Sequence, residues 1–121
     1  MKTENWNDKK FVLKKVKRHS LFLEFASKEL RSDKEVVLVA VKQNGWALKY
    51  ASEELRNYKE VVLEAVKQNG WALQFASEEL QNDLEVAIEA INEEWGAFDY
   101  VGSKAGKEIQ KLLVNFMSNK K

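Results

Sequence analysis

Hydrophobic residues recur along the chain in a pattern that repeats every 25 positions. The stretch KEVVLVAVKQ, residues 34–43, spaces its apolar side chains as one wide face of a helix, which predicts a helix with neighbours on two sides. Asp33 precedes it as a good N-cap, and Asn44-Gly45 follows it. The valine content alone favours a strand, but the apolar positions do not alternate, so the pattern favours a helix.

The Asn-Gly pairs admit two interpretations. Glycine in the left-handed conformation ends many helices, and Asn-Gly also forms hairpin turns. The flanks show no strand-like alternation, so we expect Gly45 and Gly70 to be helix C-caps. The following stretch, residues 46–55, predicts a second, shorter helix that ends near Ser52 and then turns back.

The 25-residue unit extends over nearly the whole chain, which predicts a single helical-repeat domain of residues 1–121. The units are residues 8–32, 33–57, 58–82 and 83–107, and a C-terminal capping helix follows at 108–121. One unit cannot bury its own apolar faces, whereas stacked units can. We therefore predict an all-α fold, an α-solenoid of short helix-turn-helix repeats with about nine helices.

One position of the unit is always small in the central copies. Ala40, Ala65 and Ala90 occupy it, and we expect the helices to approach closely there. Lys15 and Asn115 take this position in the terminal copies, which predicts polar capping units at both ends. In the last half-unit we expect the apolar side chains to face inward; these are Leu112, Leu113 and Phe116.

Composition narrows the possible functions. The chain has 121 residues, 45% of them hydrophobic, with no cysteine and no proline, so disulfides and thiolate chemistry are excluded. The longest apolar run, residues 36–41, is far below the roughly 20 residues of a membrane helix. We expect a cytoplasmic protein without membrane contact.

Charge is distributed unevenly, although the net charge is only +1. Residues 1–32 hold nine Lys and Arg against four Asp and Glu, whereas residues 83–107 hold two against six. Such polarity bears on the choice of partner rather than on the fold.

Two central units carry a family resemblance. DKEVVLVAVKQNGWALKYASEELRN at 33–57 and YKEVVLEAVKQNGWALQFASEELQN at 58–82 resemble the repeat of the domain-of-unknown-function 4116 family, over about residues 8–107. The first unit departs at His19-Ser20, and the fourth departs at residues 94–96 and 101–106. The resemblance implies a helical repeat and an interaction module, as in bacterial and viral proteins of this kind. It implies no activity, cofactor or catalytic residue.

Residues common to all units are expected to serve packing, whereas a functional site should interrupt the repeat. Trp46 and Trp71 are either core anchors or a platform for a base or a partner, and their recurrence favours the core. The adjacent glutamates at 53–54 and 78–79 point apart, unlike a paired acid and base. His19 has neither the nucleophile nor the further ligands that catalysis or a metal would require. We therefore expect no catalytic residue, metal or cofactor, and no enzyme activity.

The candidate binding residues lie where the repeat fails. The basic set shares one face of the first helix and comprises Lys10, Lys14, Lys17 and Arg18. The acidic fourth unit contributes Glu89, Glu93, Asp99 and the displaced Trp95. Each set also has an explanation that involves no binding partner of another kind. The charge of the basic first helix would aid solubility, and the acidic fourth unit would aid solubility or contact the basic first unit of another copy head to tail.

Together these features predict a non-catalytic protein–protein interaction module, a small stand-alone binder or inhibitor of a larger protein. The alternative is RNA or DNA binding by the basic first unit. The partner is expected to be another protein of unknown identity, and the chain itself a monomer or weakly self-associating.

Overall fold

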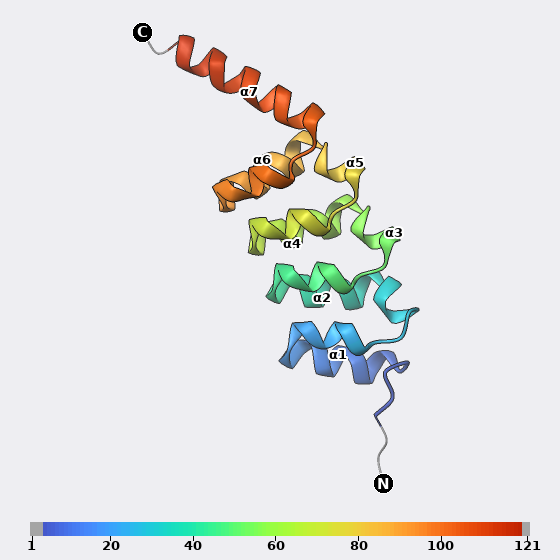
Figure 1. The fold of residues 1–121 in the computed structure, drawn as a ribbon. Coiled ribbons are helices and arrows are strands. Elements are labelled where there is room, and N and C mark those ends of the chain that lie inside the picture. The colour runs from blue at the N-terminus through green and yellow to red at the C-terminus, as the bar shows by residue number, and fades with distance from the viewer. Residues whose placement is uncertain (1–3, 120–121) are drawn as a thin grey trace.

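The first helix of each unit recurs with the predicted period. In the computed structural model, which describes residues 4–119, the described residues form helices and no strand (Figure 1). The long helices are α1 (Lys9–Arg18), α2 (Lys34–Gln43), α4 (Lys59–Gln68) and α6 (Leu84–Glu93). Their starts lie 25 residues apart, and the all-α prediction is confirmed. Within the described range, none of the helices has the length and apolar character needed to cross a membrane.

The second segment of each unit is a 3-10 helix. These segments are η1 (Ser20–Phe25), η3 (Gly45–Tyr50), η4 (Gly70–Phe75) and η5 (Trp95–Tyr100). The Asn44 side chain accepts a hydrogen bond from the backbone N–H of Trp46 at 3.0 Å, and Asn69 does the same for Trp71. The asparagine therefore begins the second segment as well as ending the first.

A third short helix fills the predicted turn. It is η2 (Leu30–Ser32) in the first unit, α3 (Glu53–Arg56) in the second and α5 (Glu78–Gln81) in the third. Ser52 and Ser77 cap α3 and α5 by accepting from the N–H of Leu55 and Leu80, at 3.3 and 3.2 Å. The prediction of two helices per unit, about nine in all, is wrong because the turns of the first three units are themselves helical.

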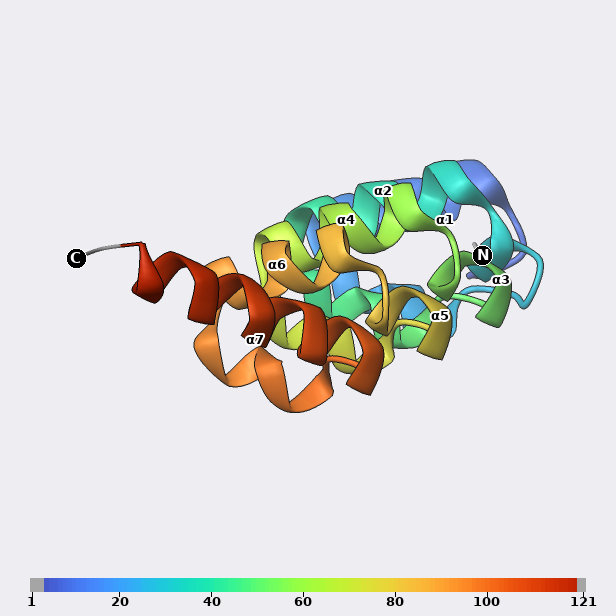
Figure 2. The same cartoon turned by 90° about the horizontal axis from the view of Figure 1, so that it is seen from above.

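Successive units lie side by side. Helix α2 contacts α1 and α4, and α4 contacts α6, so the long helices form one row with the 3-10 helices in a second (Figures 1 and 2). Valine and alanine side chains fill the space between the rows, and many of them are fully buried. One backbone hydrogen bond recurs at each junction, as from Ser52 N to Arg31 O and from Ser77 N to Arg56 O, both 2.9 Å.

The repeated glycines have a different role from the one predicted. No glycine in the described range has a positive φ, so Gly45 and Gly70 are not left-handed C-caps. A side chain on Gly45 would collide with the carbonyl oxygen of Ala65, and one on Gly70 with that of Ala90. The glycine of one unit and the alanine of the next therefore form the point of closest approach, which confirms the expectation for the alanines.

Lysines and acids form ion pairs across the same junctions. Lys9 Nζ lies 3.0 Å from Asp33 Oδ2 and 2.8 Å from Glu35 Oε1, and Lys59 pairs in the same way with Asp83 and Glu85. The hydrogen bonds to Glu35 and Asp33 raise the pKa of Lys9. Partial burial alone would raise the pKa of Asp83, but hydrogen bonds from Val86 N–H and Lys59 outweigh it and lower that pKa.

The last helix departs most from the sequence-based expectation. Helix α7 (Ser103–Ser118) begins five residues before the predicted capping helix and runs straight through Lys107 and Glu108. Those residues correspond to Asn82 and Asp83, where the third unit turns. Helix α7 therefore extends past the row instead of folding back along α6 (Figures 1 and 2).

Candidate binding surface at the C-terminal end

The fourth unit exchanges the order of its glycine and tryptophan. The second and third units read Gly-Trp at this point, whereas the fourth reads Trp95-Gly96. The ring of Trp71 reaches from the third unit into the space that a side chain on Gly96 would need. Trp95 occupies the glycine position, and 73% of its surface is exposed.

This exchange removes the glycine–alanine contact that seats α4 and α6. Trp95 stands at the position of Gly45 and Gly70, which the first unit fills with the small Ser20, and Asn115 stands where the partner alanine would be. A helix therefore cannot approach α6 and η5 as closely as α4 and α6 approach their predecessors. Only the first turns of α7 pack, with Ala105 and Ile109 joining Ala87 in a small second core.

Helix α7 is held at its start by a cap from another unit. Asn82 Oδ1 accepts from the backbone N–H of Lys104 at 3.1 Å and of Ala105 at 3.3 Å. The serine that caps the earlier turn helices is replaced by Gly102, where a side chain would collide with the Asn82 amide. Asn82 thus caps the start of α7, whose packing against α6 is confined to its first turns.

An apolar groove opens between α6, η5 and α7. It has a volume of about 300 Å³. Its lining is apolar except for one amide and consists of Ile88, Ile91, Asn92, Trp95, Phe98, Ile109, Leu112 and Leu113. We call this feature the C-terminal groove.

The C-terminal part of the chain exposes most of the large apolar side chains. Of twelve large hydrophobic side chains that are exposed in the described residues, eight lie from Leu84 onward. Ile88 is 44% exposed, whereas its counterparts Leu13, Leu38 and Leu63 are half-buried against the main core. The C-terminal end of the row is therefore apolar, and the prediction of a polar cap there is wrong.

The last half-unit shows the same error. Its three supposedly inward side chains are exposed by 50%, 46% and 58%; they are Leu112, Leu113 and Phe116. The repeat analogy failed because it assumed that α7 would be seated as the earlier helices are, and the Trp95 position prevents this.

The predicted charged residues do not form one site. The basic set lies exposed on α1. Glu93 and Asp99 are exposed and Glu89 is half-buried at the other end of the row (Figure 1). Within residues 4–119 no ion pair joins the two sets. Of the predicted residues, only Trp95 lines the C-terminal groove.

The other tryptophans contact rings of neighbouring segments, but Trp46 is 38% exposed and neither Trp46 nor Trp71 is part of the main core that the repeat predicted for them. The ring of Trp46 contacts Phe75 of the next unit at 5.5 Å, and Trp71 contacts Tyr100 at 6.0 Å. Trp6 covers the start of the row and packs against Phe11 at 5.1 Å. Its carbonyl accepts from Ser27 N–H at 2.8 Å, as Arg31 does for Ser52, so Trp6 occupies a repeat position.

His19 lies at the C-terminal end of α1, as expected for a helix-terminal imidazole. It is the C-cap residue, its side chain is exposed, and its ring contacts Phe22 at 5.2 Å. No cluster of three potential metal ligands occurs in residues 4–119.

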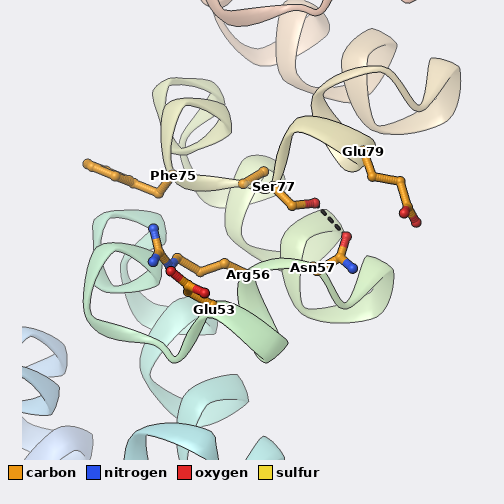
Figure 3. A pocket seen from close by; sticks show the side chains of 7 residues that line it. Glu53, Arg56, Asn57, Phe75, Ser77 and Glu79 are labelled. Carbon is orange, nitrogen blue, oxygen red and sulfur yellow. Dashed lines mark hydrogen bonds between the residues drawn. The ribbon is translucent and has the colours of Figure 1, made fainter.

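A second hollow lies at the junction of the second and third units. It has a volume of about 400 Å³ and is lined mainly by polar side chains, including Glu53, Arg56, Asn57, Ser77 and Glu79 (Figure 3). Ser77 Oγ donates to Asn57 Oδ1 inside it. The Nε of Arg56 is buried without a hydrogen-bond partner, and so is that of Arg31 one unit earlier. The unpartnered arginine Nε recurs in these two units, which favours a junction feature over a specific site.

Sequence reasoning missed most of the groove, although a signal was present. The second position of the unit is a lysine in the first three units and a leucine, Leu84, in the fourth. The three lysines are Lys9, Lys34 and Lys59. Loss of the bridging lysine together with the displaced Trp95 marks an end whose outer face is apolar.

The family model that matches the chain is described as a domain of unknown function (DUF4116). It matches residues 8–56 and 58–104, two adjacent segments of two units each. Neither the comparison with curated proteins nor the comparison with solved structures gave a match.

Proposed function

Because the chain belongs to the DUF4116 family, whose description names no activity, we propose from its own surface that it is a non-catalytic protein-binding module. The binding surface is the C-terminal groove. The observation that carries the proposal is the exposed apolar lining of this groove, with Trp95 exposed by 73% and Leu112 by 50%.

Large exposed apolar patches on soluble proteins are typical of interaction sites. Aromatic anchors in such patches supply much of the binding energy, and tryptophan is prominent among them. The groove has one polar lining residue, Asn92, and no titratable one. This chemistry suits an apolar helical segment better than a charged substrate, which also supports the proposal that the protein is not an enzyme.

The proposal also includes the architecture: the chain is an α-solenoid of 25-residue units, and the residues at the repeated positions hold successive units together. A binder of this size would act by masking a surface of a larger target, as an inhibitor does. We place this action in the cytoplasm.

Affinity capture from extracts of the native cells tests the groove. The Trp95→Ser/Leu112→Ser variant should retain the fold, because both side chains are largely exposed, and should lose the captured partner by tenfold or more. The matched control is Lys14→Glu/Lys17→Glu on the exposed face of α1, which should capture as the unmodified protein does. Full capture by the groove variant would refute this surface.

Nucleic-acid binding is the second candidate, because the basic set on α1 is exposed and none of its members forms an ion pair within the described residues. Phosphate contacts make affinity fall steeply with salt. Binding to a generic oligonucleotide at low salt, lost in Lys14→Glu/Lys17→Glu, would support this candidate. Absence of binding at low salt would remove it.

A further inference from the structure

We propose that the occupant of the C-terminal groove is helix α7 of a second copy of this chain, in a reciprocal twofold dimer. This inference rests on the proposed function, since it names the partner of the same groove. Each copy would insert the end of its α7 into the groove of the other.

The groove has a helix as its natural occupant. In the earlier units the corresponding face of the long helix receives the first helix of the next unit, as α2 receives α4 and α4 receives α6. In the fourth unit this face carries Leu84, Ile88 and Ile91 along one side of α6, at helical spacing. The part of this face that α7 leaves uncovered is thus shaped by the repeat for an apolar helix.

The same chain also offers such a helix. Beyond the groove-lining residues, α7 continues through residues 114–118, which we call the α7 overhang. Val114 and Met117 of the overhang are exposed by 62% and 68%. The sixteen residues of α7 span about 24 Å at 1.5 Å per residue, and the overhang points away from the row in both views (Figures 1 and 2).

The overhang cannot enter the groove of its own chain. Helix α7 lines that groove through Ile109, Leu112 and Leu113, and it is continuous to Ser118. A groove and an overhang on one rigid helix therefore complement each other only between two copies. A twofold axis places each overhang in the groove of the other copy, and the assembly is then closed. A head-to-tail contact would leave one groove and one overhang unfilled.

Charge supports the same pairing. Residues 83–103 contain six Asp and Glu and no Lys or Arg. The described part of α7 contains Lys104, Lys107 and Lys111 against the single acid Glu108, a charge of +2. Of these lysines only Lys111 lies close to the uncharged overhang, so a second copy of α7 would bring this one positive charge near the acidic unit, and complementary charge favours association.

The ion-pair pattern argues against simple head-to-tail growth. If a second copy continued the row after the fourth unit, its acids would pair with a lysine at position 84. That position is Leu84, so no such ion pair can form. At the other end the acid position that Glu35 occupies in the second unit is Lys10. The C-terminal end therefore lacks the pairing lysine, and the N-terminal end keeps Asp8 at the Asp33 position but lacks the second acid.

The exposed area fits a modest dimer. An aromatic side chain buries roughly 150–250 Å², and the exposed fractions at this end correspond to roughly 500 Å² of apolar side-chain surface per copy. Two such patches total roughly 1,000 Å², below the roughly 1,200 Å² at the lower end of stable interfaces, so the dimer is expected to be weak. We expect a dimer that dissociates in the micromolar range.

Sedimentation equilibrium of the full chain with complementary variants tests the reciprocal geometry. Met117→Lys changes the overhang and Ile88→Glu changes the groove, and both side chains are exposed. Each variant alone should weaken the dimer by about tenfold or more, because a charge would enter an apolar groove without a partner. An equimolar mixture should restore it, because one contact is then unmodified and the other pairs lysine with glutamate. Glu53→Lys on the exposed surface of α3 is the control and should leave the dimer unchanged.

Circular dichroism of each variant establishes that its helices are retained. A monomer at all concentrations, a dimer that resists both substitutions, or a mixture that fails to recover would each overturn the reciprocal dimer. If the unmodified chain stays monomeric while Trp95→Ser/Leu112→Ser loses capture of another protein, this inference fails and the proposed function stands. If the reciprocal dimer forms and no other protein depends on the groove, the partner is the second copy alone.

Discussion

The carbonyl oxygen of Ala65 fills the space that a side chain on Gly45 would need. These residues lie twenty positions apart and belong to successive units. The contact sets how closely two units approach, and it recurs between Gly70 and Ala90. It explains why the central units retain glycine although the backbone has no left-handed conformation there.

Gly45→Ala should therefore destabilise the fold. The added methyl group would push the third unit away from the second, and such overpacking typically costs about 1–3 kcal/mol. Chemical denaturation followed by circular dichroism measures the loss. Gly106→Ala is the matched control, because the nearest atom to its added methyl group is 3.8 Å away. It should stabilise helix α7 by about 0.5–1 kcal/mol. Equal effects at the two positions would contradict the close-approach account.

Gly96→Ala tests the exchanged order of glycine and tryptophan. The substitution should destabilise the unmodified protein by about 1–3 kcal/mol, because the Trp71 ring occupies the space. In a Trp71→Ala background the same substitution should cost much less, since the obstructing ring is gone. A double-mutant cycle measures this coupling. Additive effects of the two substitutions would show that Trp71 does not fill that space.

The acids at the unit junctions predict a pH dependence. The pKa of Asp83 is lowered in the folded chain, as is that of Asp33, where burial opposes the shift and Lys9 and the Val36 N–H outweigh it. A lowered pKa contributes stability above the unfolded value of about 3.9, and this contribution is lost as the pH falls through the folded value. The free energy of unfolding should be nearly constant above about pH 5 and fall below it.

The Asp33→Asn/Asp83→Asn variant isolates this contribution. Asparagine keeps the N-cap acceptor and removes the charge, so the double variant should lose less stability on acidification than the unmodified protein. The difference should be a few tenths of a kcal/mol per site, because these pairs are largely exposed. Identical acid titration of the two proteins would remove the ion pairs from the account.

Tyr58→Asp should stabilise the protein. Tyr58 stands at the N-cap of α4 and makes no side-chain capping bond, whereas Asp33 and Asp83 cap α2 and α6. An aspartate there would cap α4 and pair with Lys34, which now donates to the Tyr58 hydroxyl at 3.0 Å. The expected gain is about 0.5–1 kcal/mol at neutral pH, measured by denaturation. A loss would mean that the Lys34 contact with the Tyr58 ring, at 4.5 Å, is worth more than the cap.

Asn82→Ala tests how α7 is held. Its side chain accepts from two N–H groups at the start of α7, and loss of such a cap costs about 1 kcal/mol. Amide hydrogen exchange should increase selectively in residues 103–109. Asn57→Ala, at the equivalent position one unit earlier, should leave exchange in α7 unchanged. Unaltered exchange in α7 after Asn82→Ala would show that the cap does not hold it.

The long helices were predictable because their apolar spacing is periodic and each has a capping residue before it, as with Asp33 and residues 34–43. The 3-10 form of residues 45–50 was not, since six residues are too few to distinguish a period of three from one of 3.6. The role of Gly45 was missed because its partner, Ala65, is distant in sequence. A glycine that follows a helix is consistent both with a left-handed C-cap and with a close contact to another unit. The position of the next unit is needed to distinguish the two.

The C-terminal groove was only partly predictable. Trp95 was recognised because it interrupts the repeat. Leu112 and Leu113 were placed inward by analogy with Val37 and Leu38, and the analogy fails because α7 does not turn at Lys107. The signal for this was the replacement of Ser77 and Asn82 by Gly102 and Lys107, which removes the local cap and the turn residue together.

The central claim is that repeated positions serve packing and that binding occurs where the repeat ends, at the C-terminal groove. Photo-crosslinking in the native cells tests it most directly, with a photoreactive residue placed singly at position 95, 113, 14 or 53. The account predicts protein crosslinks from positions 95 and 113, to a second copy or to another protein, and none from 14 or 53. Crosslinks from position 14 or 53 with none from 95 and 113 would contradict it.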